Sequence, residues 1–61
     1  MITELTFMDS EMEVMDQTAK EMNLSYDIVR SNDGINTVAI EHEFPHTLYY
    51  FGISIAYNRM N

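Results

Sequence analysis

Two histidines and two glutamates near the middle of the chain are the side chains whose types could hold a metal ion. His42 and His46 stand beside Glu41 and Glu43. Metal sites built from imidazole and carboxylate need three or more such ligands to converge. Neighbouring side chains of a strand point to opposite faces, and a proline redirects the chain before His46, so at most two converge. The sequence therefore predicts no metal and no other cofactor, and we expect His42 to close the core near Leu24.

No set of residues predicts catalysis. Acid–base chemistry needs a concave pocket that separates the pKa values of two groups, and 61 residues leave little room for one. Cysteine is absent, which excludes disulfides, zinc–thiolate sites and thiol nucleophiles. The two glycines, Gly34 and Gly52, do not precede a predicted helix, so no phosphate-binding loop is present. We expect that the protein is not an enzyme and has no catalytic residues.

Net charge is the strongest signal in the sequence. Ten acidic side chains against three basic ones give a formal charge of -7. Such a field repels nucleic acid and anionic membranes and favours basic surfaces on other proteins. The alternative is that the charge serves solubility, because a net charge of about 2 to 8 is ordinary for a small domain.

Three of the carboxylates have the spacing of one helical ridge. Asp9, Glu13 and Asp16 follow an i, i+4, i+7 pattern, which we call the acidic ridge, with about 5 Å along the axis from one to the next. The helix dipole favours anions in the first turn, which accounts for Asp9 and Glu13 but not for Asp16. The acidic ridge is therefore a predicted partner-binding site, which could imitate the charge spacing of a nucleic-acid backbone.

The elements that must position these residues begin with a strand and a helix. Residues 3–7 alternate between apolar and polar side chains, as in a strand with one wet face. Ser10 and Glu13 match the capping-box pattern, which predicts a helix start at Ser10. Asn23 stands where a left-handed residue ends a helix. Steps of four, three, four and three place five small or flexible residues on one buried helical stripe, namely Met8, Met12, Met15, Ala19 and Met22.

A β-hairpin is predicted next. Residues 25–31 and 35–44 flank residues 32–34, and a three-residue loop that pairs Ser31 with Ile35 keeps the two faces chemically distinct. A two-residue loop would mix polar and apolar residues on each face, so the longer loop is preferred. The inner face then holds Tyr26, Ile28, Val38 and Ile40, continued by His42 and Phe44.

The last segment, residues 46–61, fits two structures. As a strand it alternates aromatic or β-branched residues with small ones, and its rings are then core. As a helix it has an apolar stripe formed by Leu48, Phe51, Gly52, Ile55 and Arg59. We predict the helix, because the apolar face of the hairpin needs a cover. The helix leaves a second apolar flank, expected to be an interface, that comprises Tyr49, Tyr50, Ile53, Tyr57 and Met60.

The predicted fold is therefore a single α+β domain, residues 1–61, of order β-α-β-β-α. Its three-stranded sheet carries the helices on one face, in a partial ferredoxin-like topology. The alternative, with a final strand, is β-α-β-β-β. No apolar run reaches the roughly 20 residues of a membrane span and no signal peptide is recognisable, so a cytoplasmic location is expected.

The predicted function is that of a small acidic inhibitor or regulator that binds another protein by surface complementarity. The composition resembles that of small phage-type inhibitors of host enzymes or defence systems. The expected partner is a larger protein with a basic surface, with no direct contact to nucleic acid or membrane, and a homodimer is also expected. The alternative is a structural or assembly module, or an obligate homodimer, whose charge serves only solubility.

Overall fold

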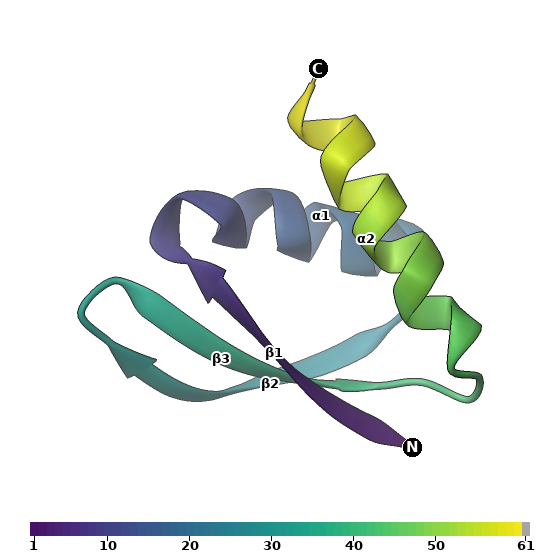
Figure 1. Cartoon of the computed structure of the whole chain (residues 1–61), viewed down its shortest axis with the longest axis horizontal. Helices are drawn as coiled ribbons and strands as arrows, with labels where there is room; N and C mark the ends of the chain where they lie inside the picture. Colours follow the sequence, from purple (N-terminus) through teal and green to yellow (C-terminus); the bar gives the residue numbers. More distant parts are fainter. Residues whose placement is uncertain (61) are drawn as a thin grey trace.

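The computed structural model describes residues 1–60, which form a three-stranded sheet covered on one face by two helices (Figure 1). The elements in chain order are β1 (Ile2–Met8), the 3-10 turn η1 (Asp9–Glu11), α1 (Met12–Glu21), β2 (Ser25–Asn32), β3 (Ile35–Glu41) and α2 (His46–Arg59). The strand order is β1-β3-β2, and β3 pairs antiparallel with both neighbours. The predicted β-α-β-β-α fold is confirmed, and the last segment is a helix.

The core lies between the sheet and the two helices. It is formed by apolar side chains from β1, α1, β3 and α2, namely Phe7, Met15, Ala19, Val38, Ile40, Phe51 and Ile55. The rings of Phe7 and Phe51 meet edge to face with centroids 6.5 Å apart, which joins β1 to α2. Of the residues predicted to form the buried helical stripe, Met15 is fully buried. The prediction is wrong for Met8, which is the last residue of β1 and is 59% exposed.

The predicted start of α1 is wrong in register, whereas its predicted end is confirmed. The backbone amide of Met8, not Ser10, donates to a glutamate, Glu11 Oε1, at 2.8 Å, and the α-helix begins only at Met12. At the other end Asn23 has φ 58°, and the Leu24 amide donates to the carbonyl of Ala19 at 2.8 Å. This is the Schellman pattern of a left-handed helix end.

The predicted three-residue loop of the hairpin is wrong, because the loop has two residues. Asn32 pairs with Ile35, and both loop residues, Asp33 and Gly34, have positive φ, as a type I′ turn requires. A β-bulge at Val29 then restores the expected faces, because it adds one residue to β2 between two ladder pairs. The predicted inner pairs are confirmed, namely Tyr26 with Ile40 and Ile28 with Val38.

Around the β3–α2 connection one predicted inner residue is buried and one is not. His42 is 5% exposed, as expected for a residue that closes the core. Phe44 is 55% exposed, because β3 ends at Glu41 and the chain turns before it, and its ring stacks on His46 at 5.3 Å. No helix within residues 1–60 has the length and apolar character needed to cross a membrane.

Candidate functional site

His42 uses both ring nitrogens within the fold. Its Nδ1 lies 2.9 Å from the carbonyl oxygen of Phe44, and its Nε2 lies 2.8 Å from the hydroxyl of Thr3. A carbonyl only accepts, so Nδ1 carries the proton, and in the neutral ring Nε2 accepts from the hydroxyl. Within residues 1–60 no three histidine or acidic side chains come together as a metal site would require. The ring of His42 therefore ties β1 to the chain after β3.

The acidic ridge is not one continuous helical row. Asp9 lies in η1, whereas Glu13 and Asp16 lie in α1. The change from 3-10 to α-helix breaks the regular axial spacing that the sequence pattern predicted. The three residues therefore have to be judged one by one.

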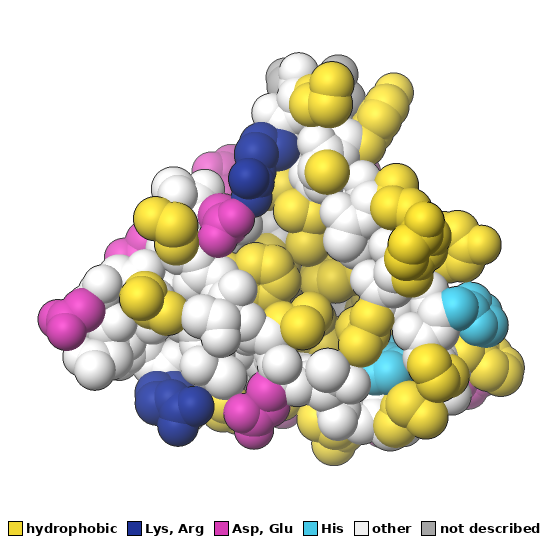
Figure 2. All heavy atoms as spheres, viewed as in Figure 1, with side chains coloured by type: hydrophobic (Ala, Val, Ile, Leu, Met, Phe, Trp, Pro, Cys, Tyr) yellow, Lys and Arg dark blue, Asp and Glu magenta, His cyan; other side chains and the backbone are white. Residues whose placement is uncertain are grey.

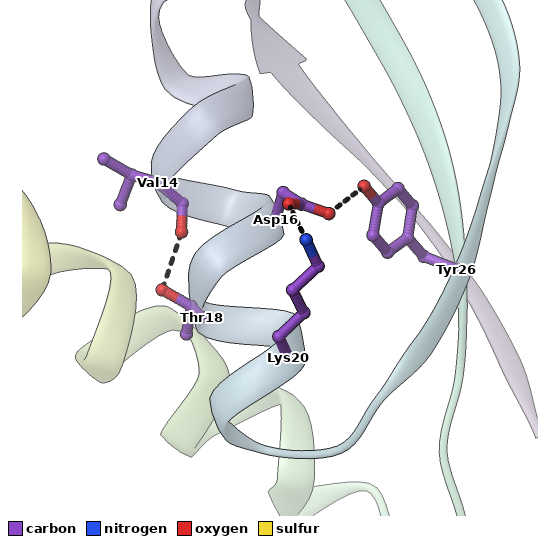
Figure 3. A network of polar contacts seen from close by, with 5 residues as sticks. All are labelled: Val14, Asp16, Thr18, Lys20 and Tyr26. Carbon is purple, nitrogen blue, oxygen red and sulfur yellow. Dashed lines mark hydrogen bonds and ion pairs between the residues drawn. The ribbon is translucent and has the colours of Figure 1, made fainter.

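Asp16 is held by two side chains. The hydroxyl of Tyr26 in β2 donates to its Oδ1 at 2.5 Å, and Lys20 lies 3.0 Å from its Oδ2 (Figure 3). These bonds, that from Tyr26 first, lower the pKa of Asp16, while the hydrogen bond to the carboxylate raises the pKa of Tyr26. Asp16 therefore anchors α1 to the edge of the sheet.

Asp9 is also engaged inside the chain. Its Oδ1 accepts from the side-chain amide of Asn36 at 2.7 Å, and its backbone amide donates to Gly34 at 2.9 Å. Asn36 is only 6% exposed, and its Oδ1 accepts from Ser31 at 2.6 Å. Asp9 thus helps to satisfy a buried amide, so only Glu13 of the acidic ridge has no partner within residues 1–60.

The carboxylates divide into two groups. Four have hydrogen-bond partners inside the chain, namely Asp9, Glu11, Asp16 and Glu21. Glu11 accepts from the Met8 amide and from Arg59, and these bonds lower its pKa. Within the described chain the other six have neither a hydrogen bond nor an ion pair, namely Glu4, Glu13, Asp27, Asp33, Glu41 and Glu43.

Three of the six unpartnered carboxylates lie on the uncovered face of the sheet. Glu4 of β1 and Asp27 of β2 both stand opposite Ala39 of the central strand, and Glu41 follows two residues later in β3. We call Glu4, Asp27 and Glu41 the acidic sheet face. From the sequence, Glu4 is a position on the wet face of a strand and Glu41 is a candidate metal ligand, and no pattern groups either with Asp27. Because β1 and β2 never adjoin, the sheet order was needed to show that Glu4 and Asp27 share one row.

The cations do little to neutralise this face. Lys20 pairs with Asp16 and Arg59 pairs with Glu11, both on the helix side. Arg30 stands opposite Thr37, in the next outward-facing row of the sheet, and has no carboxylate partner within residues 1–60. A shallow hollow of about 110 Å³ opens beside Ala39, between Asp27 and Glu41.

The predicted apolar flank of α2 is exposed. The exposed fractions of its four central residues are 69%, 55%, 50% and 67%, for Tyr49, Tyr50, Ile53 and Tyr57 in that order. Beside this flank an apolar groove of about 270 Å³ separates α2 from β1, and Figure 2 shows its hydrophobic floor beneath the helix. The groove is lined by Leu5, Thr6, Phe7, Leu48, Phe51, Gly52 and Ile55.

The groups with shifted pKa values make structural contacts. Glu11, Asp16 and Tyr26 owe their shifts first to hydrogen bonds that join elements of the fold. A hollow of about 440 Å³ beside His42 and Phe44 is lined by a histidine whose ring nitrogens are both engaged. Comparison with protein-family models, with curated proteins and with solved structures finds no match.

Proposed function

We propose that the chain is a small acidic regulator that binds a basic surface on a larger protein, as phage-type inhibitors of host enzymes or defence systems do. The observation that carries this proposal is the row of carboxylates on the uncovered sheet face, whose charge no cation of the described chain pairs with. The function is binding by surface complementarity rather than catalysis, and the expected location is the cytoplasm.

The geometry of the acidic sheet face suits long cationic side chains. Glu4 and Asp27 flank Ala39 across two inter-strand spacings, so about 10 Å separates their backbones. The small side chain of Ala39 leaves a depression between the two carboxylates. The hollow beside Ala39 has room for the aliphatic stem of a lysine or arginine. The charged head of such a side chain then lies between carboxylates.

Electrostatics gives this mode of binding a clear signature. Unpaired surface carboxylates repel one another, and the cations of a partner offset this repulsion. Such attraction mainly speeds association and is screened beyond about 8 Å at physiological ionic strength. Binding is therefore expected to weaken as salt is added.

The acidic ridge contributes to the same partner mainly through Glu13. Asp9 and Asp16 are on the surface, but part of their hydrogen-bonding capacity is taken by Asn36 and Tyr26. Occupation of a protein's DNA or RNA site by nucleic-acid mimicry remains one form of this proposal, and it places the partner's phosphate-binding cations over the acidic ridge.

The test compares two variants of equal net charge. One carries Glu4→Gln and Asp27→Asn, and the control carries Asp33→Asn and Glu43→Gln, two carboxylates that lie in neither the acidic sheet face nor the acidic ridge. Proteins captured from a candidate host lysate by the immobilised parent chain are identified by mass spectrometry, and the affinity of the purified partner is measured at 50 and 300 mM NaCl. Loss of affinity in the first variant alone supports the proposal. Equal affinity of parent and both variants would sink it.

A homodimer or assembly module is the second candidate function, favoured by the exposed apolar flank of α2. Tyr50 is 55% exposed and its ring lies against its helical neighbours Tyr49 and His46. Tyr50→Glu is therefore expected to abolish association through this flank while the far-ultraviolet circular dichroism stays unchanged.

A further inference from the structure

The outer edge of β1 is open before Met8, whose amide donates to Glu11, and it lacks the features that normally protect an edge strand. β1 pairs with β3 in an uninterrupted register from Ile2 to Met8, without a bulge, a proline or a basic residue. Its one charged side chain is Glu4. At the other edge of the sheet, β2 is interrupted by the bulge at Val29 and carries Arg30 beside it. Bulges and charges are common means of preventing edge-to-edge pairing, so only β1 is prepared for it.

The apolar groove lies directly beside this open edge. Its walls are β1 and α2, and the helix-facing side chains Leu5 and Phe7 reach it from the strand. A further strand paired with β1 would direct every second side chain into the groove. The edge and the groove therefore form one continuous surface.

Gly52 gives an independent sign that something approaches this surface. A glycine in a helix interior makes the helix less stable than an alanine would. A Cβ built at Gly52 would meet no atom within 4 Å, so no contact inside the described chain requires the glycine. Gly52 lines the groove, and the approach of an outside backbone or side chain accounts for its lack of a side chain.

We propose that the occupant is a second copy of this chain, paired through β1 about a twofold axis at Leu5. This register joins the two sheets into one of six strands and pairs the residues from Ile2 to Met8, apart from the amide of Met8, which already donates to Glu11. It places Leu5 opposite Leu5 of the other copy and Glu4 opposite Thr6 of the other copy, so helix-facing residues meet helix-facing residues. A twofold axis at Glu4 would instead oppose like charges and pair only five residues of each strand.

The same arrangement brings the two α2 helices toward each other across the grooves. The apolar flank of α2 continues from Gly52 to Ile53 and Tyr49, which are at least half exposed in one copy. The dimer also extends the acidic sheet face, because the uncovered faces of both sheets become one. The inference is independent of the proposed binding to a basic protein, and it gives the second candidate function, the homodimer, a specific interface. The net charge of -7 opposes this self-association while it favours a basic partner.

The register is tested by charge changes at Thr6, measured with the full chain by sedimentation velocity between 1 and 300 μM. Thr6→Lys should tighten the dimer, because each new lysine lies opposite Glu4 of the other copy. Two such pairs predict a roughly twofold to thirtyfold change in the dissociation constant. Thr6→Glu should weaken it by a similar factor. The matched controls are Thr37→Lys and Thr37→Glu. They place the same charges on the same face of the sheet, but on the central strand instead of the edge strand.

A second variant tests the groove without depending on charge. Gly52→Ala should raise the melting temperature of the monomer by removing a helix-interior glycine, yet weaken the dimer by placing a methyl group in the groove. Ser54→Ala, two residues further along α2 and outside the groove lining, is the control and should leave the dimer unchanged.

A monomer at 300 μM overturns the proposal, and so does a dimer that responds equally to the changes at Thr6 and Thr37. Salt should strengthen this dimer and weaken capture of a basic partner, so failure of one proposal is distinguishable from failure of the other.

Discussion

The phenol of Tyr26 donates to the carboxylate of Asp16 across 2.5 Å, and this bond joins the edge strand β2 to the middle of α1. Two features that the sequence presents separately, an inner-face tyrosine and a helical carboxylate, are thus one structural contact. The bond also makes both groups titrate away from their ordinary ranges.

Tyr26→Phe is expected to lower the free energy of unfolding in a way that depends on pH. The pKa of Asp16 is lowered, so the stabilisation is full above its ordinary value of 3.8 and is lost as the pH falls through the folded-state pKa. The pKa of Tyr26 is raised, so the stabilisation is full below 10.0 and is lost as the pH rises through the folded-state pKa. Urea unfolding should therefore show the largest difference between parent and variant at about pH 5 to 9. A difference that is constant across the whole range would contradict the assignment.

The three residues of the acidic ridge should separate stability from binding. Asp9→Asn and Asp16→Asn weaken charge-assisted hydrogen bonds to Asn36 and Tyr26, so thermal unfolding should occur at lower temperature in both variants. Glu13→Gln removes an exposed charge without a partner in the described chain, and its melting temperature should fall less than those of the other two, because only the interaction with the helix dipole is lost. If all three variants melt alike, the internal contacts of Asp9 and Asp16 contribute nothing.

Thr3→Val should destabilise the fold by about 1–3 kcal/mol, because it leaves Nε2 of the buried His42 without a partner. Thr6→Val, on the exposed face of the same strand, is the matched control and should be close to neutral. The predicted tautomer is checked separately by long-range proton–nitrogen correlation spectra, which should show the proton of neutral His42 on Nδ1. A proton on Nε2 would reverse the assigned bonds.

Gly34→Ala should destabilise the fold by about 1–2 kcal/mol through backbone strain, since Gly34 has φ 79°. The added Cβ would lie 3.6 Å from Asp9 Oδ2, an ordinary contact, so crowding adds little. Asp33→Gly in the same turn relieves a positive φ and should not destabilise the turn. Chemical denaturation measures the free energy of unfolding of both variants. An equal decrease in the two would show that the positive φ of the turn is not the cause of the destabilisation.

Local patterns in the sequence were enough to predict the element order and the inner pairs of the hairpin. The left-handed helix end at Asn23 is predictable because it depends only on neighbouring residues. The helical stripe through Phe51 and Ile55 is predictable because its residues are regularly spaced. The helix start depends on contacts across the fold instead. Asp9 is tied to Gly34 and Asn36, which hold the chain in a 3-10 turn before α1 can begin.

The hairpin loop and the candidate surfaces show the same division. The two-residue loop keeps its faces distinct only because of the bulge at Val29, and no turn residue marks that position. The acidic sheet face could not be assembled from sequence, because it requires β3 to lie between β1 and β2. The bonds from Tyr26 to Asp16 and from Asn36 to Asp9 likewise join residues at least ten positions apart.

The position of β3 in the centre of the sheet also dictates an order of folding events. β2 and β3 are joined by a two-residue turn, so their pairing closes a short loop and can form within microseconds. β1 is synthesised first, yet its partner follows 27 to 39 residues later, from the Met8–Ile35 pair to the Ile2–Glu41 pair. During synthesis the strand with the least protected edge therefore emerges from the ribosome long before its partner, and it is the part of the sheet most available to chaperones or to other nascent chains.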